Sequence, residues 1–177
     1  MERSEWQRRR AVVRLAAAAG AASAVLAGGT WGRAARAEEA IRNGAPLALP
    51  AVRLLDGSER AAAGWVGQVV VLYWWASWCP FCALQSPSMN ALWLKHRGRG
   101  LQMLGLSIDR RPEDAVAYLD KRGYTFPSAW VGPELARVLP KPKGLPVTVV
   151  RGRDGRVALL ESGQLFDEDV QELARFL

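Results

Sequence analysis

Cysteine and histidine are scarce in this chain of 177 residues, which contains two cysteines and one histidine. The cysteines are Cys79 and Cys82, and no third cysteine is present to form a structural disulfide with either of them. A zinc site needs about four ligands, and the single histidine, His96, lies between Lys95 and Arg97. We therefore assign no metal ligands, although thiolates also suit Cu(I) and a copper-binding site stays open as an alternative.

A strong excess of one charge is also lacking outside the first 37 residues. The formal net charge is +7, but residues 1–37 hold seven arginines against Glu2 and Glu5, which is +5 of that total and leaves +2 for the remainder. A nearly balanced remainder removes the main argument for a nucleic-acid partner, and we expect none.

Residues 1–37 have the organisation of an export signal. A basic segment reaches Arg14, an uncharged run occupies residues 15–32, and Ala35-Arg36-Ala37 has the A-x-A pattern of a cleavage site. We expect cleavage after Ala37 and a periplasmic or equivalent location. An uncleaved membrane anchor is the alternative, because the run is at the short end of what spans a bilayer. Arg9-Arg10 also resembles a twin-arginine signal, so both export routes stay open.

The sequence pattern of residues 38–177 predicts a single α/β domain. Strand and helix alternate in the first half, which implies a parallel sheet, and Asp154-Gly155 between two apolar stretches predicts a hairpin in the second half. The uncharged segment 68–76 is expected to be the central strand. The expected strands are 51–55, 68–76, 101–108, 147–151 and 156–161, and the expected helices are 80–97, 112–122, 133–139 and 168–177, the last capped by Asp167.

The helix 80–97 is expected to turn one broad apolar face to the core. His96, at its end, is expected in solvent, where it suits the negative end of the helix dipole. The residues of the expected face are Phe81, Leu84, Met89, Leu92 and Trp93.

Cys79 and Cys82 have the C-x-x-C spacing at the junction of the central strand and this helix. Free N–H groups and the helix dipole favour a thiolate there, so we expect a lowered pKa for Cys79. Cys82 lies one helical turn later, close enough to attack a mixed disulfide. Cys79 is then the nucleophile and Cys82 the resolving thiol, while Pro80 stiffens the turn and Trp78 can shield the sulfur.

The segment from Trp75 to Cys82 (WASWCPFC) resembles the active-site motif of thioredoxin-fold oxidoreductases. Together with the leader and the segment 144–148 (GLPVT), it is most similar to the exported TlpA/ResA-like group, over about residues 47–177. The resemblance implies a thioredoxin-like fold with a mixed sheet flanked by helices, and thiol:disulfide oxidoreductase activity. It also implies that Pro146 is a cis-proline against the disulfide, where the backbone of Leu145 can pair with a bound substrate chain. From their positions beside the cysteines, we expect Trp78, Pro80 and Phe81 to bind substrate as well.

The same resemblance implies the partners. The group usually reduces disulfides. We therefore expect the protein to act on exported proteins with disulfides or thiols and to be reduced itself by a membrane electron donor. We expect it to be a monomer. No cofactor motif is present, and we expect no cofactor. Two alternatives stay open: a disulfide-forming oxidant of the same fold, and a non-enzymatic module that binds Cu(I) or a protein.

Two residues depart from the resemblance. Tyr73 stands where many thioredoxins have a buried carboxylate, and Gln85 stands where the TlpA/ResA-like group often has a glutamate. Proton transfer to Cys82 is thus left to water or to a group that the sequence does not locate, with Glu161 as a weak candidate.

Overall fold

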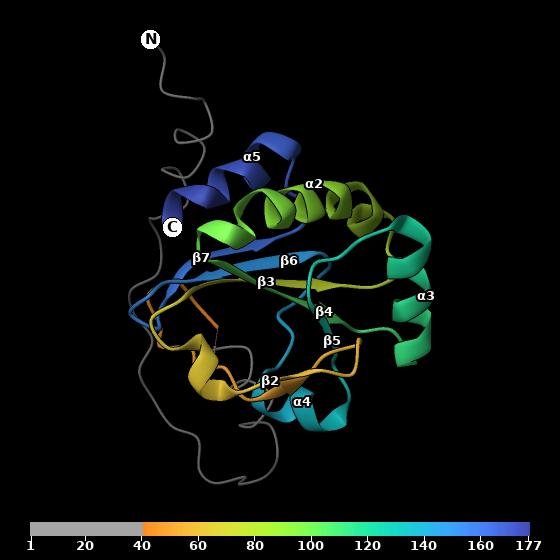
Figure 1. Cartoon of the computed structure of the whole chain (residues 1–177), viewed down its shortest axis with the longest axis horizontal. Helices are drawn as coiled ribbons and strands as arrows, with labels where there is room; N and C mark the ends of the chain where they lie inside the picture. Colours follow the sequence, from red (N-terminus) through yellow and green to blue (C-terminus); the bar gives the residue numbers. More distant parts are fainter. Residues whose placement is uncertain (1–40) are drawn as a thin grey trace, which may run out of the picture. The chain divides into compact units, whose positions relative to one another are not determined.

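The computed structural model describes residues 41–177 (Figure 1). The expected leader, residues 1–37, lies outside the described residues. The sheet has five strands in the order β5-β4-β3-β6-β7, and two short strands, β1 and β2, pair separately. The strands are β1 (Val52–Arg53), β2 (Glu59–Arg60), β3 (Val69–Trp75), β4 (Leu101–Ser107), β5 (Ser128–Trp130), β6 (Val147–Arg151) and β7 (Val157–Ser162). The α-helices are α2 (Pro80–His96), α3 (Pro112–Arg122), α4 (Pro133–Val138) and α5 (Asp167–Glu172), and short 3-10 helices are η2 (Ala62–Trp65), η3 (Arg97–Arg99) and η4 (Leu173–Phe176).

The sheet is mixed. Strands β3, β4 and β5 run parallel to one another, whereas β6 is antiparallel to both β3 and β7. The predicted central strand and hairpin are confirmed. Mixed pairing with helices on the sheet is the thioredoxin-like α/β architecture that the resemblance implied.

Strand β3 is buried along its whole length because both faces of the sheet are covered. Its β-branched and aromatic residues suit a strand without a solvent face. Val69, Val71, Tyr73 and Trp75 pack into one core cluster with residues of α2, α3 and α5. Val70, Leu72 and Trp74 pack into a second cluster with the segment 41–54 and η2. Figure 1 shows α2 and α5 together on one side of the sheet and α4 with β2 on the other.

The N-terminal segment contacts both outer strands of the sheet. The Gly44 N–H donates to Val157 O of β7 at 2.7 Å, and the Leu55 N–H donates to Ser128 O of β5 at 2.7 Å. Strand β5 was not predicted, because a strand of three residues has too short a sequence pattern to be recognised. The hydrogen bond from the Leu55 N–H, which lies far away in the sequence, helps to hold this strand in place.

The apolar face predicted for α2 is wrong in part. Phe81 and Leu84 are 57% and 64% exposed. The buried residues instead recur every three or four positions along the helix, and some of them are polar. A search for hydrophobic residues alone therefore does not find this face. Its members are Cys82, Gln85, Ser86, Met89, Leu92 and His96. His96 continues this face and is buried, which corrects its predicted place in solvent.

The cap predicted for the last helix is also wrong. Asp167 is the first helical residue of α5, and Phe166 is the N-cap. The Asp169 carboxylate accepts a hydrogen bond from the Phe166 N–H at 3.3 Å, so the acid that holds the helix start is two residues later than expected. Within residues 41–177, no helix is long and apolar enough to cross a membrane.

Candidate active site

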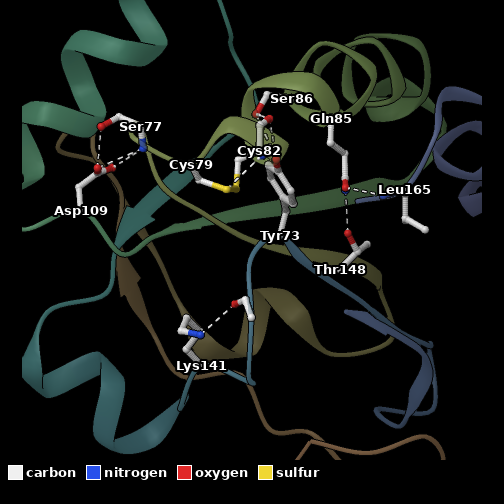
Figure 2. The surroundings of a disulfide bond; sticks show 11 residues. Tyr73, Ser77, Cys79, Cys82, Gln85, Ser86, Asp109, Lys141, Thr148 and Leu165 are labelled. Carbon is white, nitrogen blue, oxygen red and sulfur yellow. Dashed lines mark hydrogen bonds between the residues drawn. A yellow bond between two sulfur atoms is a disulfide. The ribbon is translucent and has the colours of Figure 1, made fainter. Parts of the chain in front are cut away.

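Cys79 and Cys82 form a disulfide at the point where β3 ends and α2 begins (Figure 2). Their Cα atoms are 5.2 Å apart. Cys79 is the N-cap of α2, with extended backbone angles, and its sulfur accepts a hydrogen bond from the Cys82 N–H at 3.2 Å. Pro80 occupies the first helical turn, where its missing N–H costs little. When the pair is reduced, this donor and the helix N-terminus favour a thiolate at Cys79.

The two sulfur-bearing residues differ in exposure. Cys79 retains 4% of its surface, whereas Cys82 has none. An incoming disulfide can therefore approach Cys79 more directly than Cys82, which is the asymmetry that a nucleophile and a resolving thiol require.

Two hydroxyl groups lie beside the backbone of Cys82. Ser86 Oγ donates to Cys82 O at 2.7 Å, and Tyr73 Oη lies 3.2 Å from the same oxygen. Burial raises the pKa of Tyr73, and its hydrogen bond with Ser86 offsets this only in part. Tyr73 therefore stays protonated where many thioredoxins have a carboxylate.

Gln85 joins three parts of the chain next to this site. Its Nε2 donates to Thr148 Oγ1 of β6 at 3.0 Å, and its Oε1 accepts from the Leu165 N–H at 2.8 Å (Figure 2). The side chain is 1% exposed. Glu161, the weak candidate for proton transfer, is the β7 partner of Thr148 and so lies one strand beyond it.

The Leu145–Pro146 peptide bond is cis, as the resemblance implied. Pro146 is buried and directly precedes Val147, whose partner in β3 is Trp74. Leu145 packs against the core cluster that contains both cysteines. The loop before it is held by Lys141, whose Nζ donates to the backbone oxygens of Pro142 and Gly144 at 2.6 and 3.0 Å, and burial lowers the pKa of this lysine.

Three large apolar side chains next to the disulfide face solvent. Trp78 is 63% exposed, and Phe81 and Leu84 are exposed to a similar degree. Pro80 is exposed beside them. Adjacent exposed apolar side chains are typical of a surface that contacts other proteins. Sequence reasoning placed Trp78 here. It listed Phe81 both as a substrate-binding residue and on the core-facing side of the helix, and it assigned Leu84 to the core-facing side alone.

Sequence reasoning missed one buried carboxylate close to the site. Asp109 follows β4, and its side chain accepts hydrogen bonds from Ser77, two residues before Cys79. The signal was present, because the C-terminal ends of parallel strands meet at one edge of a sheet, so residues after β3 and β4 come together there. Among residues 41–177, no group of three or more His, Cys, Asp or Glu side chains is placed to hold a metal ion.

Comparisons with known proteins identify the chemistry. Residues 47–132 match the AhpC/TSA family. The chain is 24% identical over 129 residues to the thiol-disulfide oxidoreductase ResA of Geobacillus thermodenitrificans, with 67% of this chain and 68% of that protein covered. ResA of Bacillus cereus is 26% identical over 122 residues, with 67% and 68% covered.

Solved structures give the same fold. A thiol:disulfide interchange protein of the thioredoxin family from Chlorobium tepidum superposes with a TM-score of 0.66 at 21% identity, covering 76% of this chain and 97% of that one. StoA from Bacillus subtilis superposes with a TM-score of 0.61 at 18% identity, covering 72% and 98%. The C-x-x-C disulfide lies within the segment matched to the AhpC/TSA family. The chain is therefore a thiol-disulfide oxidoreductase with the thioredoxin fold, and it is similar to the ResA proteins.

Proposed function

We propose that this oxidoreductase is exported and reduces disulfides in other exported proteins. In this proposal residues 1–37 are a leader cleaved after Ala37, and residues 38–177 act as a monomeric thioredoxin-like domain in the periplasm or an equivalent space. The observation that carries the proposal is the Cys79–Cys82 disulfide at the N-terminus of α2, with Cys79 as the more accessible partner. The reductive direction rests on the resemblance to the TlpA/ResA-like group.

The reaction needs only the two cysteines and a source of electrons. In the reduced protein the Cys79 thiolate attacks one sulfur of a substrate disulfide, forms a mixed disulfide and releases the first substrate thiolate, which takes up a proton. Cys82, as thiolate, then attacks the Cys79 sulfur, and the second substrate thiolate leaves. The substrate has gained two electrons and two protons, and the Cys79–Cys82 disulfide has formed. A membrane electron donor returns two electrons to the pair.

The surrounding residues have matching roles in this proposal. The exposed side chains of Trp78 and Phe81 contact the substrate chain, and the exposed Pro80 lies between them. The backbone of Leu145 hydrogen-bonds to the substrate, next to Pro146. The proximity of Leu145 to the core cluster that contains Cys79 supports this assignment.

The reduction potential tests the direction of electron flow. The purified protein is equilibrated with glutathione or dithiothreitol buffers while tryptophan fluorescence is followed. A potential near the thioredoxin value of about −270 mV supports a reductant, whereas a value near about −120 mV supports the disulfide-forming alternative. If the pair shows no reversible titration and the protein retains copper instead, the binding-module alternative replaces the enzyme in this proposal.

Two variants test the roles of the cysteines. Cys79→Ser should abolish reduction of insulin disulfides, because no thiol remains at the more accessible of the two positions. Cys82→Ser should instead accumulate mixed disulfides with substrate, which non-reducing electrophoresis detects. Full activity in Cys79→Ser would contradict the mechanism.

A further inference from the structure

Asp109 is a buried acid that the thiol chemistry above does not use. It is 4% exposed and follows the end of β4. Its Oδ1 accepts from the Ser77 N–H at 3.1 Å and from Ser77 Oγ at 2.7 Å (Figure 2). Its Oδ2 accepts from Ser107 Oγ at 2.8 Å. Both oxygens act only as acceptors, which is the hydrogen-bonding pattern of an ionised carboxylate. A full negative charge is thus held in the protein interior at this point.

The backbone of Asp109 is fixed as firmly as its side chain. The Asp109 N–H donates to Ser107 Oγ at 3.1 Å, and the Asp109 carbonyl accepts from Trp130 Nε1 of β5 at 2.8 Å. Asp109, through its carboxylate and its backbone together, therefore holds the loop between β3 and Cys79 against the ends of β4 and β5.

The charge lies close to the attacking sulfur. Ser77 precedes Cys79 by two residues, and consecutive Cα atoms are about 3.8 Å apart, so the carboxylate is within roughly 15 Å of the Cys79 sulfur. Both side chains are almost entirely buried, so water screens their interaction less than it would at the surface. A negative charge at this range disfavours a thiolate and opposes the stabilisation that the N-terminus of α2 provides.

Destabilising the thiolate destabilises the reduced form of the pair relative to the disulfide. A dithiol whose reduced form is less stable is a better electron donor. The opposite holds for a strong oxidant, in which the reduced form is stabilised. We propose that Asp109 is a positioning residue that orders the loop before Cys79 and whose negative charge keeps the Cys79–Cys82 pair reducing. This inference rests on the proposed function, because it assumes that the two cysteines exchange disulfides.

Other charged groups adjoin the site, and the test must leave them unchanged. Arg110 and Arg111 follow Asp109, and Arg111 is paired with Asp114. Lys141 lies in the loop before Leu145, and α2 has no acidic residue in its first turn. Lys143, in the loop before β6, and Glu161, on β7, also have interactions of their own. All of these groups are the same in the wild type and in the variants below.

Asp109→Asn removes the charge and can retain the hydrogen bonds from Ser77 to Oδ1, while the second contact of the Ser77 N–H, to Oδ2 at 3.2 Å, is lost. The amide oxygen can accept from Ser77, while the amide nitrogen replaces Oδ2 and donates to Ser107 Oγ. We expect the Cys79 pKa, measured from the pH dependence of alkylation in the reduced protein, to fall by about one unit. The equilibrium constant with glutathione should shift by up to about tenfold toward the dithiol, which corresponds to a rise of about 30 mV in reduction potential.

Two controls separate charge from geometry. Asp154→Asn removes a charge from the turn after β6, at the end of the sheet opposite to Cys79. The asparagine side-chain oxygen can still accept the hydrogen bond from the Arg156 N–H. The Cys79 pKa and the reduction potential of this variant should match those of the wild type. Ser77→Ala removes one hydrogen bond but keeps the Asp109 charge, and it should leave the Cys79 pKa close to the wild-type value.

The outcomes are distinguishable. If Asp109→Asn is folded and its potential equals that of Asp154→Asn, or if Ser77→Ala shifts the pKa as much as Asp109→Asn does, the proposed role of the charge is wrong. Asp109→Ser, which also removes the charge and retains a hydroxyl, is the second variant; if neither variant folds, Asp109 has a structural role only. If the wild-type pair itself shows no reversible titration, the proposed function fails, whatever the variants show.

Discussion

The hydroxyl oxygens of Tyr73 and Ser86 lie 3.1 Å apart, and both groups also contact the backbone oxygen of Cys82. The two hydroxyl groups lie next to the backbone of the resolving cysteine, Cys82. Tyr73 occupies the position at which many thioredoxins have a carboxylate. Burial raises the pKa of Tyr73, so this position carries no charge over the range in which cysteine thiols titrate.

Tyr73→Phe should therefore affect stability more than the pH dependence of catalysis. The loss of one buried hydroxyl should lower the free energy of unfolding by about 1 kcal/mol, while Ser86 still donates to Cys82 O. The profile of disulfide-exchange rate against pH should keep its shape. Tyr124→Phe, in the same aromatic cluster, is the matched control. A new inflection in the Tyr73→Phe profile would show that this hydroxyl takes part in proton transfer.

Gln85→Ala should destabilise the protein by about 1–3 kcal/mol, because Thr148 and the Leu165 N–H each lose a buried hydrogen-bond partner. Urea unfolding measures the change. Gln171→Ala on α5, which is partly exposed, should cost less than about 0.5 kcal/mol. Equal losses in the two variants would mean that the bridge made by Gln85 adds nothing to stability.

Gly105→Ala should destabilise β4 because the sheet has no room for a methyl group at this position. The added carbon would lie 2.9 Å from Phe126 Cε2 and 3.0 Å from Trp75 Nε1. Overpacking of this kind costs about 1–3 kcal/mol. Gly98→Ala, where the space is open, is the control and should be nearly neutral. Thermal unfolding of both variants makes the comparison, and equal melting temperatures would contradict the tight packing around Gly105.

The burial of His96 should make stability depend on pH. Burial lowers its pKa, and the positive charges of Arg99 and Lys95 lower it further. The folded protein therefore holds a neutral imidazole, whereas the unfolded chain takes up a proton below its ordinary pKa of about 6.5. This contribution is complete above that pH and is lost as the pH falls below it toward the lower folded pKa.

Unfolding in urea at a series of pH values tests this expectation. The wild type should lose more stability than His96→Gln when the pH is lowered through that window, since the other ionisable groups are the same in both proteins. Parallel curves for the two proteins would place His96 in contact with water.

The parts of the fold that the sequence predicts best are those with strong local signals. Strand β3 is uncharged and fully buried, and α3 has Pro112 in its first turn and Gly123 in a left-handed conformation after its last residue. The disulfide at the start of α2 also followed from a local pattern, since the chain has only two cysteines.

The parts that were missed depend on contacts between distant segments. Ser77 and Asp109 are 32 residues apart in sequence, and only the parallel pairing of β3 with β4 brings them together. His96 was misplaced because Gln85 and Ser86 interrupt the hydrophobic pattern of the buried face of α2. Burial of these polar groups is possible because Gln85 bonds to Thr148 of β6, and Ser86 bonds to Cys82 O within α2 and to Tyr73 of β3.

The contacts of the segment 41–55 with both outer strands also bear on how this oxidoreductase meets other proteins. The free edge of a sheet offers backbone donors and acceptors to any extended chain, and many proteins bind peptides by adding them there as a further strand. Here the residues around Gly44 and Leu55 already use those groups on β7 and β5. Strand addition is thus blocked at these positions. In the proposed function, an extended substrate chain would instead bind at the loop containing Pro146 and at the exposed side chains around Cys79.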